Sequence, residues 1–387
     1  MPITSSQRAA TIESFKVMDL LKRARALEAE GHDVIHLEVG EPDFKVAKPI
    51  ATAAIKAIES GYTQYTPAAG IPELRQRIAS FYQERYGVSV SPEQVLVTPG
   101  ASGALLLAFA LLVNSGQRMM MSDPSYPCNR QFLHFLEASA QLVPTGPVEK
   151  FQLTASLIDQ HWSADTTGVL LASPSNPTGT LVSQAEMGLI AHKVRELGGQ
   201  LLVDELYHGL TYGVDAMTVL QTDPDAFVIN SFSKYFGMTG WRLGWLVAPE
   251  EAVKEMEKMA QNLFISPSTI AQYAALAAFE PESIEIFEQR RVAFGQRRDH
   301  LVSGLLDLGF SIPALPEGAF YVYADASAFT DNSFDFCWSL LEQNHIAVTP
   351  GADFGQTDAA RYVRFSYTTS IENIDKALLR LADRLKS

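Results

Sequence analysis

Cysteine, positive charge and long apolar runs are all scarce in this sequence. Only Cys128 and Cys337 are present, which excludes a disulfide framework and a cysteine-based metal site. The formal net charge of -14 argues against a surface for nucleic acid, so we expect no nucleic-acid partner. The longest apolar run, residues 104–113, is too short to span a bilayer. We therefore expect a buried helix there and no membrane partner.

Several signature segments are also absent. Residues 1–15 are polar and are interrupted by Pro2, so they lack the apolar core of a signal peptide, and we expect a cytoplasmic protein. The dinucleotide-binding pattern Gly-x-Gly-x-x-Gly does not occur. A hydrolase nucleophile elbow, Gly-x-Ser-x-Gly, would need glycine at position 104, where the chain has Ala104.

The composition allows a sizeable core, because 47% of the 387 residues are hydrophobic. Short apolar runs typical of strands alternate with helical stretches such as residues 185–197. Since these runs are apolar almost throughout, we expect strands that helices cover on both faces. The pattern predicts an α/β fold with a mainly parallel seven-stranded sheet. The expected strands are residues 95–98, 118–122, 141–144, 168–172, 201–204, 226–230 and 243–247.

After Pro281 the pattern changes. We expect a long charged helix at residues 283–308 and then short strands at 320–324 and 362–366. The closing helix has one apolar face, formed by Ile371, Ile374, Leu378, Leu381 and Leu385. These elements predict a second, smaller α+β domain. We expect residues 1–45 to form an N-terminal arm and part of the small domain, residues 46–282 the large domain, and residues 283–387 the small C-terminal domain.

Lys234 follows two serines, Ser231 and Ser233, and precedes Arg242. A lysine amine can condense with an aldehyde when a nearby cation or burial keeps part of it unprotonated. We expect the two hydroxyls to alternate along an extended segment, where they and Arg242 offer three groups for one phosphate. Pyridoxal phosphate needs this set. The alternative is a solvated loop with a surface lysine, and the apolar strands on either side argue against it.

Two further segments follow expected strands, where open α/β sheets bind their ligands. Residues 99–103, Pro-Gly-Ala-Ser-Gly, join a strand to the apolar helix, and small residues let backbone N–H groups approach an anion. Asp204 ends another strand, where a buried carboxylate would keep a ring nitrogen protonated. From the residues alone, a helix N-cap explains Asp204 equally well.

These segments resemble the fold-type I pyridoxal-phosphate aminotransferases of the class I/II group, which includes bacterial aspartate aminotransferases. The resemblance also rests on the Asp-Glu-Leu-Tyr run that begins at Asp204 and the Asn-Pro-Thr-Gly run that begins at Asn176, and it extends from about Ile35 to Thr368. It implies that the cofactor is pyridoxal 5'-phosphate, that Lys234 forms the Schiff base, and that Asp204 pairs with the pyridine nitrogen.

The resemblance implies roles for other residues of a cofactor site in the large domain. Asn176 and Tyr207 would donate to the phenolate oxygen, and the backbone amides of Ala101 and Ser102 would hold the phosphate. Tyr126 would stack on the pyridine ring. Without the resemblance, the Asn-Pro run indicates a plain turn and Tyr126 indicates ordinary packing.

Further positions carry implications for assembly and substrate. The segment around Tyr65 resembles one that crosses a dimer interface to the partner's phosphate, which implies a homodimer with shared sites. Arg364 resembles the arginine that binds the substrate α-carboxylate through a fork of two hydrogen bonds, with a surface strand arginine as the alternative. Gly40 would offer its amide to the same carboxylate, beside Asn176. Residues 315–321 and 350–355 also match, and we expect turns and close packing there.

The implied reaction is ping-pong transamination between an α-amino acid and a 2-oxo acid, with Lys234 as general base and acid. Ser102 stands where some family members have a lysine, and no residue is assigned to bind a distal carboxylate, for which Arg130 and Lys45 are candidates. We therefore expect a broad amino acid:2-oxo acid aminotransferase, with aspartate, alanine and aromatic donors all open. A carbon–sulfur β-lyase would share every residue named. A non-catalytic cofactor-binding regulator would need a DNA-binding segment, which does not precede Ile35.

Overall fold

All seven apolar runs predicted as strands form one sheet in the computed structural model, which describes residues 3–12 and 14–386. The strand order is β2-β8-β7-β6-β5-β3-β4, and among these seven β8 runs antiparallel to its neighbours. The predicted mainly parallel α/β sheet is therefore confirmed. In that order, the strands are Val95–Thr98, Gly244–Val247, Phe227–Ser231, Gln200–Asp204, Thr166–Ala172, Arg118–Asp123 and Ser139–Pro144.

Helices cover both faces of this sheet, because its strands are apolar on both sides. Along β6, Leu201 and Val203 belong to one buried cluster and Leu202 to a second. Helices α4 and α8 pack against the first face, and α5 and α9 pack on the second. Their bounds are Pro72–Tyr86 for α4, Gln184–Glu196 for α8, Gly100–Leu112 for α5 and Glu250–Leu263 for α9.

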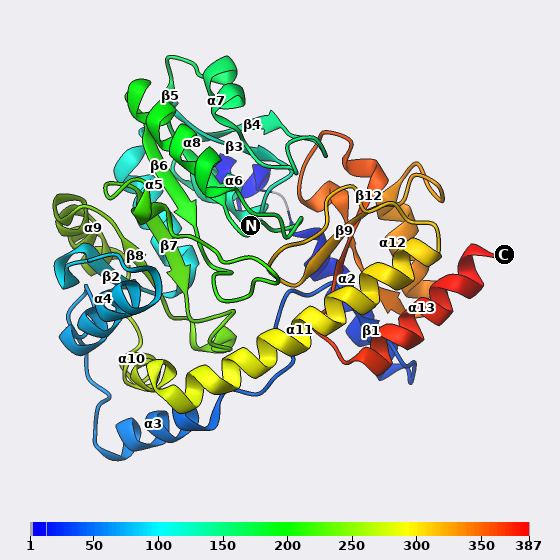
Figure 1. Ribbon diagram of the computed structural model, residues 1–387, viewed down its shortest axis with the longest axis horizontal. Coiled ribbons are helices and arrows are strands. Elements are labelled where there is room, and N and C mark those ends of the chain that lie inside the picture. The colour runs from blue at the N-terminus through cyan, green and yellow to red at the C-terminus, as the bar shows by residue number, and fades with distance from the viewer. Residues whose placement is uncertain (1–2, 13, 387) are drawn as a thin grey trace.

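The C-terminal part builds a second, smaller sheet region. Strands β11, β12 and β9 form an antiparallel sheet, and β1 pairs with β10, Ile35 opposite Ile346. The long helix α11, Pro281–Asp307, runs from beside α3, Lys48–Glu59, and α10, Thr269–Leu276, to this region (Figure 1). The other bounds are β1 Ile35–His36, β9 Tyr321–Asp325, β10 Ile346–Ala347, β11 Thr349–Pro350, β12 Tyr362–Ser366, α2 Lys16–Ala29, α12 Ser333–Asn344 and α13 Ile371–Leu385.

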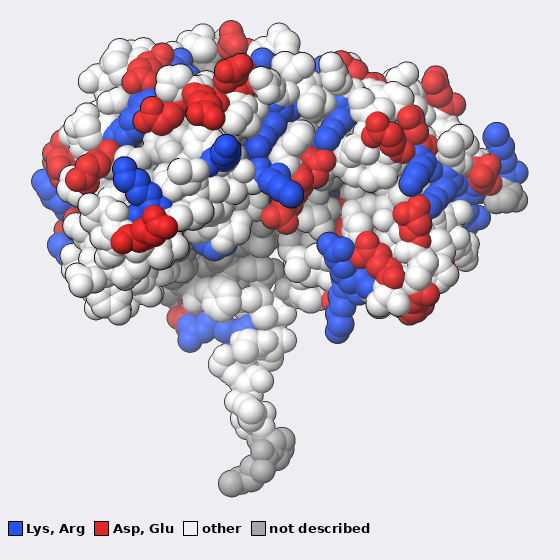
Figure 2. Space-filling model, turned by 90° about the horizontal axis from the view of Figure 1, so that it is seen from below, with Lys and Arg blue, Asp and Glu red and all other residues white. Residues whose placement is uncertain are grey.

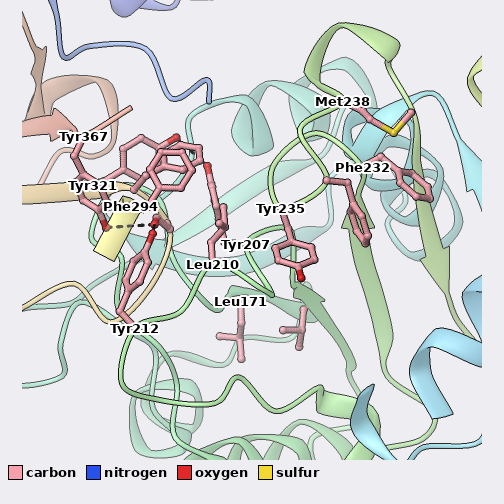
Figure 3. Close-up of a cluster of buried hydrophobic side chains, with 14 of the residues drawn as sticks. Leu171, Tyr207, Leu210, Tyr212, Phe232, Tyr235, Met238, Phe294, Tyr321 and Tyr367 are labelled. Atoms are coloured by element: carbon pink, nitrogen blue, oxygen red, sulfur yellow. Dashed lines mark hydrogen bonds between the residues drawn. The ribbon is translucent and has the colours of Figure 1, made fainter. Parts of the chain in front are cut away.

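One continuous core joins the two sheet regions. Figure 3 shows part of it, with Leu171 from β5, Phe294 from α11 and Tyr321 from β9 in one cluster of buried side chains. A shared core fixes the strand ends of the large sheet relative to the small one. The division into residues 1–45, 46–282 and 283–387 stays a prediction.

The N-terminal segment stands out from the body of the molecule (Figure 2). Its short helix α1, Gln7–Thr11, touches the body through an ion pair between Arg8 and Glu137. Within the described ranges, no helix combines the length and the apolar character needed to cross a membrane. The remaining helices are α6 Cys128–Phe135 and α7 Ala155–His161.

Some helices and strands begin earlier than predicted, because residues that we assigned to the preceding loop already belong to the element. Helix α5 begins at Gly100 and not at residue 104, because the small residues of the preceding loop form its first turn. Helix α11 begins at Pro281, which fits the first turn of a helix. Strand β4 begins at Ser139, two residues before the predicted start.

Candidate functional site

A cavity of about 240 Å³ lies at the carboxyl ends of the central strands, where the small sheet region meets the large one. It brings together every residue predicted to bind the cofactor or the α-carboxylate except Tyr65, although these residues come from segments far apart in the chain. The predicted residues that line it are Gly40, Ala101, Ser102, Tyr126, Asn176, Asp204, Tyr207, Ser231, Ser233, Lys234, Arg242 and Arg364.

One corner of the cavity is built to receive an anion. Helix α5 starts there after Pro99, whose side chain cannot cap the first free N–H groups. The guanidinium of Arg242 lies so close to Gly100 that a Cβ on that residue would come within 2.8 Å of Nη2. The backbone of Gly100 has φ +71°, a conformation that suits glycine. The start of α5 and the guanidinium of Arg242 therefore lie at the same corner of the cavity.

Two hydroxyls complete this corner, but in a turn and not in the extended segment that we predicted. Strand β7 ends at Ser231, and the chain turns through Phe232 and Ser233. Ser231 Oγ accepts a hydrogen bond from the backbone N–H of Ser233 at 3.0 Å and lies 2.9 Å from Ser233 Oγ. We expected the alternation of an extended strand to bring the two hydroxyls together. In the structure, the turn brings them together instead.

Lys234 follows this turn, and its side chain lines the cavity. Its Nζ donates a hydrogen bond to the backbone oxygen of Gly40 at 2.7 Å. Burial lowers the pKa of Lys234 to about 8, and the charges of Arg364 and Arg242 also lower it, whereas Glu41 and Asp204 act in the opposite direction. About a tenth of the amine is therefore uncharged at pH 7, far more than for an ordinary lysine.

Asp204 ends β6 and lies deeper in the same cavity. Burial raises the pKa of Asp204 to about 6, against the lowering effect of a hydrogen bond that its Oδ1 accepts from the N–H of Leu206 at 3.0 Å. That bond spans residues 204–206, a turn follows at residues 206–209, and no helix starts there. The alternative interpretation of Asp204 as a helix N-cap is therefore wrong.

Arg364 lies on β12 at the opposite wall and is held from several sides. Its Nη1 donates to Asn176 Oδ1 at 2.9 Å, and its Nη2 donates to the backbone oxygen of Glu38. The rings of Tyr321 and Phe354 lie 4.3 and 4.7 Å from the guanidinium carbon. Nε is buried without a partner among the described residues, so the arginine keeps a donor for a ligand. Its burial excludes the alternative of a surface strand arginine.

Tyrosine hydroxyls line the wall between these groups. Tyr207 and Tyr321 share a hydrogen bond of 2.9 Å, and burial raises the pKa of both phenols. Burial also raises the pKa of Tyr126, which lies across the cavity. Tyr321 belongs to residues 315–321, for which we expected only a structural role. That expectation holds for Gly318, which packs against Pro174, but not for Tyr321.

Several lining residues were not predicted from the sequence. Phe15, Val17 and Met18 give no signal in the sequence, because apolar residues near a chain end are unremarkable. Glu38 did carry one, since a charged residue between apolar neighbours is unusual. It is fully buried, and one of its oxygens lies 2.7 Å from His36 Nδ1.

Three candidates lie outside this cavity. Tyr65 is 81% exposed. Arg130 donates to the backbone oxygen of Asp353 at 3.0 Å and lines a separate, smaller cavity. Lys45 is exposed, and its backbone oxygen accepts a hydrogen bond from Arg290. Neither Arg130 nor Lys45 is placed to bind a distal carboxylate in the main cavity of this chain.

Comparison with known proteins agrees with this geometry. The sequence profile of the family described as aminotransferase class I and II matches residues 32–381. The chain belongs to the class I and II aminotransferases. It is 38% identical to the valine–pyruvate aminotransferase of Mycobacterium tuberculosis, over 98% of each chain.

Solved structures share the whole fold of this aminotransferase. The crystal structure of an aminotransferase from Mycobacterium tuberculosis superimposes with a TM-score of 0.96 at 37% identity, over 100% of both chains. Aspartate aminotransferase from Thermus thermophilus with maleate superimposes with a TM-score of 0.94 at 33% identity, over 99% of this chain and 100% of that one. The protein is thus a fold-type I transferase that carries out transamination, and these relatives do not favour a β-lyase. The family depends on pyridoxal phosphate.

Proposed function

We propose that this aminotransferase holds pyridoxal 5'-phosphate in the main cavity through Lys234 and transfers the amino group of an α-amino acid to a 2-oxo acid. The observation that carries the proposal is the partly uncharged Lys234 amine between an anion-binding corner and a buried carboxylate. Pyridoxal phosphate, when bound, supplies an aldehyde for the amine and an electron-accepting ring for the substrate carbanion.

The residues present fit each part of that group. The uncapped start of α5, with Ala101 and Ser102, and the guanidinium of Arg242 suit a phosphate, and the hydroxyls of Ser231 and Ser233 lie beside them. Asp204, at the far end of the cavity wall, would pair with a pyridinium nitrogen. Asn176 and Tyr207 would donate to the phenolate oxygen, and Tyr126 would pack on the ring.

The residues of the opposite wall suit an amino acid. The unpartnered Nε of Arg364 is a buried cationic donor, and a carboxylate is the ligand that such a group prefers. Gly40 lies in the wall between Arg364 and Lys234, and Tyr321 packs against it so closely that a Cβ would overlap the tyrosine ring. A carboxylate on Arg364, with the Gly40 amide beside it, would set the substrate Cα near Nζ of Lys234.

Lys234 would then act on the proton at Cα. A lysine whose pKa lies near 8 can accept a proton at neutral pH and return it, which is the requirement for one residue that serves as both base and acid. The apolar and aromatic walls would limit the access of water to the reacting atoms once substrate is bound.

Replacement of Lys234 tests this assignment. We expect Lys234→Ala to abolish turnover while the folded protein still binds pyridoxal phosphate non-covalently, because the phosphate corner is intact. Borohydride reduction should attach the cofactor to Lys234 in the wild type and to no residue in the variant. Lys254→Ala, which removes an exposed lysine on α9, is the matched control and should keep activity. Normal turnover by Lys234→Ala, or attachment to another lysine, overturns the assignment.

The assembly we propose is a homodimer with shared sites. Tyr65 is 81% exposed and does not line the main cavity of its own chain, and Tyr62, Ile55 and Ile58 are exposed as well. A second copy would cover these side chains and bring Tyr65 to the phosphate corner of its neighbour. A cytoplasmic location, which cell fractionation tests, belongs to the same proposal.

Mixed dimers test the sharing directly. Lys234→Ala and Tyr65→Ala subunits, each poorly active alone, should regain activity when unfolded and refolded together, because one site of each mixed dimer has both native residues. No gain over the two separate variants would contradict a shared site.

A further inference from the structure

The cavity continues beyond the residues assigned to the cofactor into an apolar wall. This wall, which we call the entrance wall, is formed by Phe15, Val17 and Met18 at the start of α2. The ring of Phe15 packs edge-on against Tyr126, with 6.1 Å between ring centroids. An amino acid whose α-carboxylate binds Arg364 would therefore extend its side chain along apolar groups.

A single carboxylate holds the entrance wall in place. Phe15 precedes α2 and provides no side-chain cap, so the first two N–H groups of that helix need another acceptor. Buried Asp353 supplies it, accepting from the N–H of Lys16 at 3.0 Å and from that of Val17 at 2.8 Å. Its negative charge also favours the positive end of the helix dipole.

The same carboxylate connects the entrance wall to the substrate arginine. Asp353 is followed by Phe354, whose ring centroid lies 4.7 Å from the guanidinium carbon of Arg364. The segment that anchors the start of α2 therefore also covers the group that would bind the α-carboxylate. The entrance wall and Arg364 line the same cavity.

The described residues of the chain itself supply the cavity with no spare cation for a second carboxylate. Its lining, taken over the described residues, includes three cationic side chains, Lys234, Arg242 and Arg364, and each has a place in the proposed function. The lining also includes Glu38, a fully buried acid. A carboxylate on the substrate side chain would lie against the apolar entrance wall, and its burial there without a partner is costly.

We propose that the entrance wall, positioned by Asp353, receives the side chain of the amino donor and selects uncharged apolar side chains over those of aspartate and glutamate. This rests on the proposed function and names its substrate class. Branched or unbranched aliphatic and aromatic amino acids fit such a wall.

Single-turnover kinetics with the holoenzyme test the selection. Leucine, methionine, phenylalanine, alanine and aspartate are mixed in turn with the enzyme, and the loss of cofactor absorbance gives a second-order rate constant for each. We expect the apolar donors to exceed aspartate by about 100-fold or more, a factor that mismatched polar groups commonly produce. Aspartate as fast as leucine overturns the selection and leaves the proposed function standing. No reaction with any amino acid overturns the proposed function itself.

A cation added to the entrance wall should relax the selection. Met18 is 54% exposed, so Met18→Lys introduces charge without burying it. We expect the ratio of aspartate to leucine rate constants to rise about three- to fivefold, the effect of one partly exposed ion pair. Leu379→Lys, at a 68% exposed site on α13, makes the same charge change away from the cavity and should leave the ratio alone. An equal rise in both variants, or in neither, overturns the placement of the substrate side chain.

Asp353→Asn tests the positioning. The amide offers one acceptor oxygen where the carboxylate used two, so the start of α2 should shift. We expect the rate constant for leucine to fall more than that for alanine, whose side chain is too short to use the entrance wall, by about tenfold in their ratio. A purely structural role would lower both by the same factor, and that result would overturn the positioning role of Asp353.

Discussion

Arg364 on β12 donates a hydrogen bond to Asn176 Oδ1 at 2.9 Å, although the two residues are 188 positions apart in the chain. Asn176 follows β5 of the large sheet, and β12 belongs to the small sheet region. The bond therefore joins the wall that we assign to the cofactor and the wall that we assign to the substrate. Relative movement of the two sheet regions would change the distance between these groups.

Arg364→Lys should weaken amino-acid binding far more than cofactor binding. Lysine keeps the charge but loses the planar fork and the stacking between Tyr321 and Phe354. Loss of one charge-assisted hydrogen bond costs roughly 1.5–3 kcal/mol, which is about ten- to hundredfold in apparent affinity. Titration of holoenzyme with amino acids, followed by absorbance, measures this change. Amines without a carboxylate are the control, and equal losses for amines and amino acids would show that Arg364 is structural.

Asp204→Asn should slow the chemical step by on the order of a hundredfold or more, because the variant keeps the shape of the side chain and loses its charge. The hydrogen bond that Leu206 donates to Asp204 Oδ1 can be kept by the amide oxygen, so the turn after β6 should survive. Single-turnover rates and thermal unfolding separate the two effects. A variant within a few-fold of the wild-type rate would leave Asp204 as a turn residue only.

The sequence predicted those parts of the site that lie in short motifs at strand ends. Asp204, Lys234 and Asn176 follow buried strands, and the parallel sheet brings such strand ends to one edge. Arg364 was found by resemblance, since a single arginine in a strand has no local signature. The residues that surround it, Tyr321 and Phe354, are separated from it in the chain and meet it only through the small antiparallel sheet and the loops next to it.

The apolar residues that line the cavity could not be predicted from the sequence, for a physical reason. Phe15, Val17 and Met18 enter the cavity because Asp353, more than 300 residues away, binds the backbone of the same segment. A contact between a side chain and a backbone amide leaves no pattern in either segment. The candidates Arg130 and Lys45 failed for a related reason, since the direction of a long side chain depends on its tertiary partners.

The pKa of Lys234 predicts how cofactor-free enzyme takes up pyridoxal phosphate. Burial lowers this pKa from 10.5 to about 8, and only the uncharged amine attacks an aldehyde. The rate of covalent attachment should therefore rise about tenfold per pH unit below pH 8 and level off above it. Stopped-flow absorbance measures the rate, and non-covalent binding to Lys234→Ala over the same pH range corrects for changes in affinity. A rate that still climbs steeply to pH 10 would contradict a buried, uncharged amine.

Glu205 gives a prediction about stability, because it is fully buried beside Asp204 and lines no part of the cavity. Its Oε1 accepts from Thr218 Oγ1 at 3.0 Å and from the N–H of Val219 at 2.8 Å. Burial raises the pKa of Glu205 to about 8, and the charge of Asp204 also raises it. The folded protein therefore holds a proton on Glu205 at pH values where the unfolded chain, with an ordinary pKa of 4.5, has released it.

Glu205→Gln should accordingly gain stability over the wild type as the pH rises. The folded pKa lies above the unfolded one, so protonation of Glu205 contributes most stability below pH 4.5, and the wild type loses this contribution progressively between about pH 4.5 and 8. Glutamine keeps the acceptor for Thr218 and Val219 and carries no proton to lose. Urea unfolding measures the free energy of unfolding of both proteins at pH 5 and pH 8. Between these pH values, the variant should gain more than about 1 kcal/mol relative to the wild type.

Glu205→Ala, which leaves both donors without an acceptor, should instead cost about 1–3 kcal/mol relative to Glu205→Gln at either pH. A difference between wild type and Glu205→Gln that stays constant from pH 5 to 8 would mean that Glu205 is ionised in the folded protein throughout this range.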